Sequence, residues 1–448
     1  MNIVFDIDGV LTDYEWFMNA YGGRYLSRHG QSGTVQNPEA YSFRERFGCP
    51  RKMEVRFFAR YLFWYAKKIP IRENATTVIR KLQKEGHDIH FITARVLADK
   101  RNLPGRLMRF HLKRWLKKNG IRYTSISYVS LEHCREEKLE LCKKLKADIV
   151  VEDDPGNIEK LRDICRVICV DASYNQNMKD VEHVVDLGEL YQCIQGRQMK
   201  QLSSREIREL EMDKRVQYLC RLKKYYEELP FDHAHRKKYD RFIVRSVKRY
   251  LWILKCYFSI QIEGKQNLRA ADSVIYVCNH RSSLDIFLCY TILGSIPARY
   301  LGKREYEMKW YSFLQRRAGT VFVERENAWS RKASKNLMIQ ALLNGGNVLL
   351  YPEGTRNKTG QVMLPFRRGA VNMAQITGCP IVPIVIRKMG KRIRVRIEEA
   401  VYIKREDHTG EKNDFIRDKM CRVYERMGAG EMGRDILLLD DEKTIRKK

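Results

Sequence analysis

The chain has 448 residues, a hydrophobic content of 44% and a formal net charge of +30. Such a length predicts two or three domains, and such a composition excludes a disordered or collagen-like chain. Residues 1–195 hold 33 Lys and Arg against 26 Asp and Glu, so most of the positive excess lies beyond residue 195. A basic surface of that size attracts anionic lipid or nucleic acid, unless it is solvated and has no partner.

Cysteine usage and apolar runs indicate a cytoplasmic protein. The twelve cysteines show no paired Cys-x-x-Cys spacing, which favours reduced thiols. The chain opens on a strand followed by two aspartates, and this opening does not fit a secretory leader. No segment reaches the roughly 18 consecutive apolar residues that a membrane-spanning helix needs.

Alternating helices and strands characterise the first 195 residues. A strand over 2–5 comes first, and an aromatic and arginine-rich segment over 14–74 follows, with a helix over 55–68. Beyond it we expect helices over 75–85, 107–118, 132–146 and 158–162, and strands over 88–92, 125–129, 148–151 and 167–170. This alternation predicts an α/β fold with a parallel sheet and helices on both of its faces.

Two acids, Asp6 and Asp8, follow the first strand at the carboxyl edge, where parallel sheets place their ligands. Because the two lie close together, one can attack a phosphorus atom while the other moves a proton. Both would repel a phosphate, so the pair requires a divalent cation, which we expect to be Mg²⁺.

Three later features complete this N-terminal site. Thr93 brings a hydroxyl to the end of the second strand, and Lys138 brings a charge that can neutralise phosphoryl oxygens. Glu152, Asp153 and Asp154 follow the strand over 148–151 and form a carboxylate cluster suited to a metal ion.

The order of these four motifs resembles that of the haloacid dehalogenase-like hydrolases. The residues within the motifs are loosely most similar to those of the 5′-nucleotidase-like branch. The resemblance implies a Rossmann-like domain over 1–195 with a small helical cap over about 14–74. The roles that it implies are nucleophile for Asp6, general acid and base for Asp8, phosphate ligand for Thr93 and Lys138, and metal ligand for Asp6, Asp8 and Asp153 with Glu152 or Asp154.

Several points about this region stay open. The sequence does not decide which of the three clustered acids contacts the ion directly, and it does not give the substrate. A degenerate, non-catalytic phosphatase fold is the alternative. Aromatic residues such as Phe57 and Tyr61 are expected to form mostly cap core, with base stacking as the other interpretation.

The segment after residue 195 changes in character. Residues 196–240 are densely charged and predict a helical linker, with a helix over 205–229 that Pro230 ends. Residues 241–260 predict a basic, amphipathic and partly aromatic helix. Such a helix either lies among lipid headgroups or packs on its own domain.

A second α/β pattern begins at residue 274, with expected strands over 274–278, 321–323, 348–350 and 381–386. His280 and Asp285 follow the first of these strands, where it turns into a helix. A carboxylate fixes an imidazole in one tautomer and makes it more basic, so this pair can deprotonate an alcohol that attacks a thioester.

A second polar group follows the strand over 348–350. Here Gly354 permits a tight turn, while Thr355 and Arg356 offer donors to an anion. Arginine suits a phosphate through its bidentate fork, and Arg325 lies at another expected strand end. Lys303 is a further candidate for a phosphate contact.

Together with Val382-Pro383-Ile384, these motifs resemble the glycerolipid acyltransferases, specifically the 1-acylglycerol-3-phosphate acyltransferases, over about residues 242–405. The resemblance implies a domain over 241–448 held on a membrane face, with acyl-CoA or acyl-carrier protein as donor. The roles that it implies are base for His280, orienting partner for Asp285, and acceptor contacts for Glu353, Gly354, Thr355 and Arg356, with Arg325 and Lys303 nearby. Tyr351 stands where the family more often has Phe, and the basic run 386–404 is expected to hold a strand and a lipid-facing surface.

The sequence thus predicts a bifunctional phospholipid-biosynthesis enzyme, peripheral on the cytoplasmic face of an anionic membrane. It would acylate the sn-2 hydroxyl of 1-acylglycerol-3-phosphate and hydrolyse a phosphomonoester with Mg²⁺. The alternative is an acyltransferase for another lysolipid or an amino alcohol, with a non-catalytic or nucleotidase-like N-terminal domain. No nucleic-acid recognition motif supports a nucleic-acid partner, while acyl-chain preference, channelling and oligomeric state are not predicted.

Overall fold

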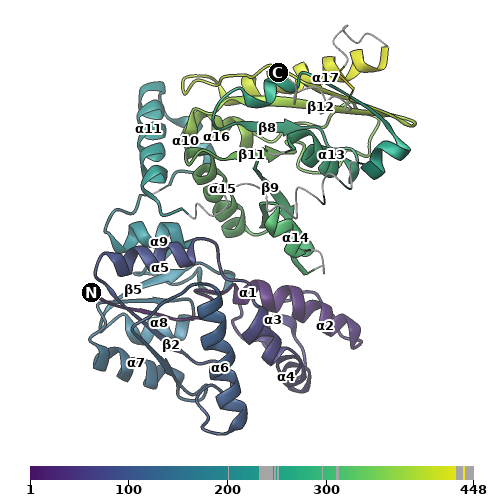
Figure 1. The fold of residues 1–448 in the computed structure, drawn as a ribbon. Coiled ribbons are helices and arrows are strands. Elements are labelled where there is room, and N and C mark those ends of the chain that lie inside the picture. Colours follow the sequence, from purple (N-terminus) through teal and green to yellow (C-terminus); the bar gives the residue numbers. More distant parts are fainter. Residues whose placement is uncertain are drawn as a thin grey trace, which may run out of the picture. The chain divides into compact units, whose positions relative to one another are not determined.

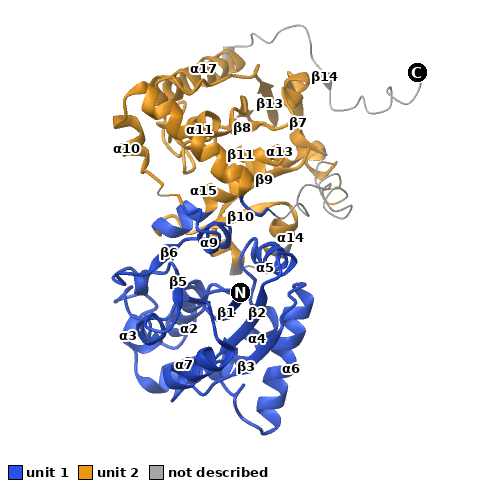
Figure 2. Ribbon diagram, turned by 90° about the vertical axis from the view of Figure 1, so that its left-hand side faces the viewer, with its two compact units in different colours: residues 1–198, 229–232, 328–333 blue, residues 199–228, 233–327, 334–448 orange. Residues whose placement is uncertain are grey.

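The computed structural model describes residues 1–199, 201–231, 246, 249, 252–294, 296–308, 312–429 and 437–438. The chain forms two compact units, which are coloured separately in Figure 2. The first consists of residues 1–198, 229–232 and 328–333, and the second of residues 199–228, 233–327 and 334–448.

The first unit contains a six-stranded parallel sheet in the order β3-β2-β1-β4-β5-β6. Its strands are β1 (Asn2–Phe5), β2 (Asp88–Thr93), β3 (Ser125–Tyr128), β4 (Ile149–Glu152), β5 (Arg166–Val170) and β6 (Glu182–Val184). The first five confirm the predicted α/β pattern, with ends that differ by at most one residue. The strand order reverses beside β1, which is where open α/β sheets bind ligands.

Helices cover both faces of this sheet (Figure 1). The helices are α5 (Ala75–Lys84), α6 (Leu103–Lys118), α7 (Cys134–Leu145), α8 (Pro155–Leu161) and α9 (Leu187–Ile194). One sheet face packs Val4, Val150 and Cys169 against side chains of α7 and α8. Helix α8 begins because the Asp154 side chain accepts from the Asn157 N–H at 3.0 Å, which caps the first turn.

The helices between β1 and α5 form the cap, namely α1 (Tyr14–Phe17), the π-helix η1 (Met18–Gly22), α2 (Gly23–Arg28), α3 (Phe43–Phe47) and α4 (Arg51–Lys68). Their core is aromatic, since the rings of Phe43 and Phe57 stack at 4.4 Å and Phe17 lies 5.4 Å from Phe57. Phe57 is fully buried, as expected for cap core. In contrast, Tyr61 and Tyr65 line a cavity, so only part of the aromatic cluster is cap core.

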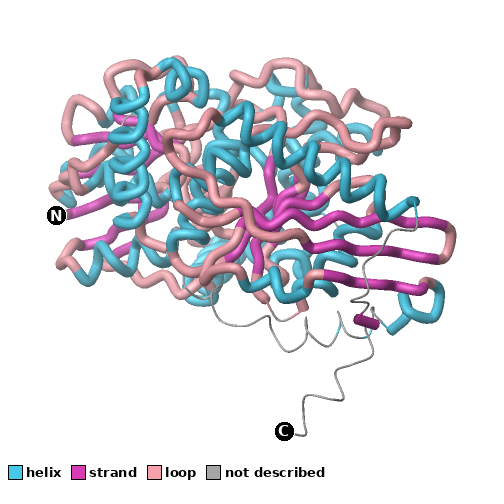
Figure 3. Tube along the Cα trace, turned by 90° about the horizontal axis from the view of Figure 1, so that it is seen from above, coloured by secondary structure: helices cyan, strands magenta, loops and turns pink. Residues whose placement is uncertain are grey.

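The second unit contains an eight-stranded mixed sheet in the order β10-β9-β11-β8-β12-β13-β7-β14. Its strands are β7 (Ser259–Glu263), β8 (Ile275–Cys278), β9 (Ala298–Lys303), β10 (Thr320–Val323), β11 (Asn347–Leu350), β12 (Ile381–Met389), β13 (Arg392–Ile397) and β14 (Leu437–Leu438). The long strands β12 and β13 pair in antiparallel fashion and β13 pairs with β7 (Figure 3). Strand β13 lies inside the basic run 386–404, as predicted.

The helices of the second unit are α10 (Ser204–Glu209), α11 (Met212–Glu228), α13 (Leu284–Leu293), α14 (Ser312–Arg317), α16 (Gly369–Thr377), α17 (Thr409–Ala429) and, from residue 334 on, α15 (Ala328–Leu343). The expected single helix over 205–229 is therefore two helices, because the chain is extended at Leu210. Helix α11 packs against α16, and the buried Tyr226 donates to Asn336 at 2.6 Å. These residues are thus part of a packed unit.

Most of the amphipathic helix predicted over 241–260 lies outside the described residues. Within that stretch residues 252–257 are helical, while Ser259 and Ile260 already belong to β7, so the prediction is wrong at its C-terminal end. Among the helices that the structure describes, none combines the length and the apolar character needed to cross a bilayer.

Candidate active sites

The N-terminal site lies at the carboxyl ends of β1 and β4. The Lys138 ammonium, which α7 carries, donates to Asp6 Oδ1 at 2.8 Å and to Glu152 Oε2 at 2.6 Å. All three side chains are buried, with exposed fractions of 4%, 6% and 1% respectively. The structure thus brings together the first, third and fourth predicted motifs in one ion-pair network.

Burial controls the protonation of this network. It raises the pKa of Asp6 to about 7, against the charge of Lys138, which lowers it. The pKa of Lys138 is raised well above its usual value, because Asp6 and Glu152 outweigh the opposing effect of burial. A lysine that stays charged beside an acid is suited to hold an anionic phosphoryl group.

The three clustered acids have different surroundings. Glu152 uses its second oxygen, Oε1, to accept the N–H groups of Asp153 and Asp154 at 3.1 and 3.2 Å. Asp154 caps α8. Asp153 accepts the Tyr174 hydroxyl on Oδ2, whereas its Oδ1 is buried and lacks a hydrogen bond within the described part of the chain.

Three carboxylates of this cluster could hold a metal ion. Asp6, Glu152 and Asp153 each offer one oxygen, and these oxygens lie within 4.8 Å of one another. Carboxylate oxygens are the ligands that Mg²⁺ takes, and the unpartnered Oδ1 makes Asp153 the acid that best fits direct contact. Glu152 is occupied by Lys138 and two backbone N–H groups, so it also serves to position its neighbours.

Asp8 has a partner that the sequence did not predict. Arg95, two residues beyond β2, forms an ion pair with Asp8, with its Nε donating to Oδ2 at 3.1 Å. Its guanidinium also lies 5.0 Å from the centre of the Tyr65 ring. Arg95 is 5% exposed, and Thr93, which is completely buried, has no hydrogen-bond partner for Oγ1 among the described residues.

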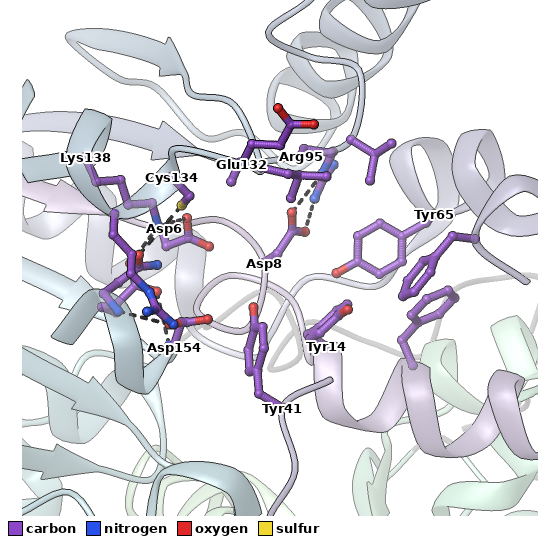
Figure 4. Close-up of a pocket in the computed structure, with 18 of the residues that line it drawn as sticks. Asp6, Asp8, Tyr14, Tyr41, Tyr65, Arg95, Glu132, Cys134, Lys138 and Asp154 are labelled. Atoms are coloured by element: carbon purple, nitrogen blue, oxygen red, sulfur yellow. Dashed lines mark hydrogen bonds and ion pairs between the residues drawn. The ribbon is translucent and has the colours of Figure 1, made fainter. Parts of the chain in front are cut away.

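A cavity of about 460 Å³ opens above these groups. Figure 4 shows Asp6, Asp8 and Arg95 on one side of it and the rings of Tyr14 and Tyr41 across from them. Other lining residues from the cap and the loops are Phe17, Phe58, Tyr61, Leu62, Tyr65, Val96 and Leu131. The site therefore combines a charged floor with a largely aromatic wall.

The C-terminal site lies where β8 turns into α13. Nδ1 of His280 lies 3.1 Å from Asp285 Oδ2, and since a carboxylate accepts, Nδ1 donates. The same oxygen accepts the N–H groups of Arg281 and Ser282, both at 2.7 Å. His280 and Asp285 are 9% and 5% exposed. This arrangement fixes the imidazole and leaves Nε2 as the nitrogen that can take a proton.

Glu353 connects this pair to the second predicted motif. Its Oε1 accepts the His280 N–H at 2.7 Å, and its Oε2 accepts the Leu364 N–H at 2.9 Å. Both oxygens are therefore engaged within the protein. The geometry gives Glu353 a supporting contact to His280, where the family resemblance implied an acceptor contact.

Two residues to which the sequence assigned no role, Asn279 and Tyr351, also contact the His280 loop. The Asn279 side chain exchanges two hydrogen bonds with Ile386 of β12, at 2.8 and 2.9 Å. The Tyr351 ring stacks on His280 with centroids 4.3 Å apart. Tyr351 is thus in direct contact with His280.

Of the predicted anion-binding residues, Arg325 contacts Gly354 directly. Arg325 donates to the Gly354 carbonyl at 2.6 Å, and a Cβ on Gly354 would lie 2.4 Å from Arg367 Nε. Burial lowers the pKa of Arg325, and Arg367 lowers it further. Lys303 is exposed at the end of β9, Thr355 is exposed, and Arg356 is half-buried. Arg367 is a further basic residue at this place.

Two family models match separate parts of the chain. Residues 1–201 match the model described as 5′ nucleotidase, deoxy (pyrimidine), cytosolic type C protein. Residues 259–387 match the model described as acyltransferase. The first region contains every predicted residue of the N-terminal site, and the second every predicted residue of the C-terminal site.

Curated relatives match the C-terminal part. A 1-acyl-sn-glycerol-3-phosphate acyltransferase of Cocos nucifera is 30% identical over 210 residues, which are 44% of this chain and 66% of the relative. The chloroplastic enzyme LPAT1 of Arabidopsis thaliana is 30% identical, over 36% of this chain and 45% of the relative. The human alpha enzyme is 32% identical, over 32% and 51%. The chain thus spans about half to two thirds of the length of these relatives.

Two solved structures each match part of the chain with a low TM-score. The 1-acyl-sn-glycerophosphate acyltransferase PlsC from Thermotoga maritima has a TM-score of 0.35 and 22% identity, with 50% of this chain and 85% of that chain covered. A β-phosphoglucomutase from Clostridium difficile has a TM-score of 0.31 and 16% identity, with 44% and 96% covered.

Proposed function

Because the chain joins a haloacid dehalogenase-like hydrolase region to a glycerolipid acyltransferase region, we propose that it is a bifunctional enzyme of phospholipid synthesis. The C-terminal site would transfer an acyl group from acyl-CoA or acyl-carrier protein to the sn-2 hydroxyl of 1-acylglycerol-3-phosphate, giving phosphatidic acid. The N-terminal site would hydrolyse a phosphomonoester. The observation that carries the first activity is the buried His280–Asp285 pair inside the matched region.

The acyl transfer follows from the orientation of His280. Asp285 holds Nδ1–H, so Nε2 takes the proton of the acceptor hydroxyl as its oxygen attacks the thioester carbonyl. The C–S bond breaks, and the thiolate leaves and is protonated to the free thiol. Arg325 and Arg367, which lie beside Gly354, place positive charge where the acceptor's phosphate would bind.

The hydrolysis follows from the acids at β1. An Asp6 oxygen attacks phosphorus while Asp8 gives a proton to the leaving oxygen, and water then hydrolyses the aspartyl phosphate. Thr93 and Lys138 hold the phosphoryl oxygens. The unpartnered Oδ1 of Asp153 and the Asp6 carboxylate fit a divalent cation. A bound Mg²⁺ would offset the negative charge of the acids and the phosphate.

Membrane attachment belongs to the same proposal. In the helical residues 252–257, Trp252 and Tyr257 are 67% and 69% exposed, and Ile253 is also exposed. Exposed aromatic residues next to basic ones favour an interface of anionic lipid headgroups. We therefore place the enzyme peripherally on the cytoplasmic face of the membrane.

The first experiment measures thiol release from oleoyl-CoA by the purified full chain with 1-oleoylglycerol-3-phosphate, for wild type and His280→Ala. We expect release that depends on His280, with phosphatidic acid as the lipid product. The folded wild-type protein could be inactive in this assay and instead acylate another lysolipid or an amino alcohol. That molecule would then replace 1-acylglycerol-3-phosphate as the proposed acceptor. Equal release by His280→Ala would refute the role of His280.

A further inference from the structure

The short turn Ser173–Asn175 (η2), which follows β5, contacts the N-terminal site at three points. The Tyr174 hydroxyl donates to the Asp153 carboxylate. The Asn175 side chain donates to the Asp153 carbonyl at 3.0 Å, and the Ser173 N–H donates to Glu15 of the cap at 3.0 Å. One turn therefore fixes both the side chain and the backbone of Asp153.

Of the two oxygens of the Asp153 carboxylate, only Oδ2 has a hydrogen bond among the described residues. Oδ2 carries the contact with Tyr174, and a Cβ on Gly9 would lie only 1.9 Å from that oxygen. Gly9 has a φ of +88°, so the β1 loop packs directly on the carboxylate. Oδ1 is buried without a hydrogen-bond partner among the described residues, and one oxygen of this carboxylate lies within 4.8 Å of oxygens of Asp6 and Glu152.

Tyr174 is a buried hydrogen-bond donor to Asp153. Its ring is 7% exposed and packs edge-to-face on Tyr41 with centroids 4.9 Å apart. A phenol with an ordinary pKa of about 10 keeps its proton at neutral pH, and the Tyr174 hydroxyl directs this proton toward Oδ2.

We propose that Tyr174 is a positioning residue for the divalent cation: its hydroxyl turns Asp153 so that Oδ1 faces the ion. This inference rests on the proposed hydrolase function, in which Asp153 is a metal ligand. Loss of a hydrogen-bond partner of a ligand typically weakens metal binding by ~10–100-fold. We expect a loss of this size for Tyr174→Phe, which keeps the ring and removes only the hydroxyl.

The test is a titration of the purified full chain with MnCl₂, in which free Mn²⁺ is followed by electron paramagnetic resonance. The Mn²⁺ binding that is lost in Asp153→Asn is the binding at this site. Tyr191→Phe is the matched control. Tyr191 is 6% exposed and its hydroxyl also donates to a carboxylate, that of Glu85, at 2.6 Å. We expect the Kd to rise by ~10–100-fold in Tyr174→Phe and to stay at the wild-type value in Tyr191→Phe.

The outcomes separate this inference from the function beneath it. A wild-type chain without an Asp153-dependent Mn²⁺ site would overturn the proposed cation requirement and, with it, the role of Tyr174. If wild type has the Asp153-dependent Mn²⁺ site and Tyr174→Phe binds Mn²⁺ with the same Kd, the inference about Tyr174 is overturned, whereas the proposed function stands. As a second readout, MgCl₂ should raise the Tm of Tyr174→Phe less than that of wild type at equal concentration. If Tyr174→Phe shows no cooperative melting with or without MgCl₂, Tyr174 is needed for folding, and the inference is also overturned.

Discussion

The Glu353 carboxylate accepts the His280 N–H at 2.7 Å, and this contact joins two motifs that lie 73 positions apart in the chain. Glu353 is 5% exposed and also accepts the Leu364 N–H. A carboxylate that accepts two backbone N–H groups holds both loops at fixed positions. The second motif therefore supports His280 as well as surrounding the expected acceptor.

Glu353→Ala should destabilise the second unit and reduce acyl transfer. The change removes the acceptor of the buried His280 N–H, at about 1–3 kcal/mol, and that of the partly buried Leu364 N–H, at a smaller cost. Glu353→Gln keeps one acceptor oxygen and should lose less. Urea unfolding together with thiol-release assays measures both effects. A Glu353→Ala chain with wild-type stability and a selective rise in KM for the acceptor would instead favour direct acceptor binding.

The two active sites should respond independently to substitution. His280→Ala removes the proposed base and should lower acyl transfer by roughly 10²–10⁴-fold, the usual contribution of such a group. Hydrolysis of p-nitrophenyl phosphate should be unchanged. Asp6→Asn removes the proposed nucleophile and should abolish hydrolysis while acyl transfer continues. Loss of both activities in either variant would contradict this assignment, provided that circular dichroism shows a folded chain.

Sequence patterns predicted the sheets better than the contacts around the sites. Buried parallel strands such as β1 and β4 are apolar runs followed by acids, so their ends could be located within one or two residues. The short strand β6 and the helix α9 were missed. Strand β6 covers only Glu182–Val184, too few residues for a periodic pattern.

Some site residues carry no signal in the sequence. Arg95 and Tyr174 reach the N-terminal site from loops, and Asn279 is distinguished only by its contact with Ile386 of a distant strand. Their partners are fixed by the folded sheet. In contrast, Asp6, Lys138 and Asp153 could be predicted because the carboxyl edge of a parallel sheet collects the residues that follow its strands.

Lys138→Met should strongly destabilise the first unit. It leaves the buried Asp6 and Glu152 without their shared cation, and removing one partner of a buried ion pair costs about 3–5 kcal/mol. Adding Glu152→Gln should recover part of the loss, because the two effects are coupled. Thermal and urea unfolding measure the changes. Lys100→Met, which breaks the exposed pair with Asp99, serves as control and should have no measurable effect. Additive losses in the double variant would contradict the coupling.

Trp252→Ser with Tyr257→Ser should weaken binding to membranes. Both side chains are more than 60% exposed in the helical residues 252–257, so their removal changes the surface and leaves the core intact. Sedimentation with vesicles of phosphatidylcholine and phosphatidylglycerol should show a several-fold lower bound fraction. Tyr402→Ser, at another tyrosine that is 64% exposed, is the matched control. Equal sedimentation of all three chains would place the lipid contact elsewhere.

The stability of the first unit should fall as the pH rises above about 6.5, because the pKa of His183 is raised in the folded chain. Its Nδ1 lies 2.7 Å from Asp171 Oδ1 and its Nε2 lies 3.1 Å from the Met178 carbonyl, so both ring nitrogens face acceptors. The bond with Asp171 is the main cause that raises the pKa of His183. A raised pKa stabilises the fold fully below the unfolded value of about 6.5, and this contribution disappears as the pH rises through the folded pKa. Melting temperatures between pH 6 and pH 9 should therefore decline more steeply in wild type than in His183→Gln, whereas parallel curves would exclude this role for His183.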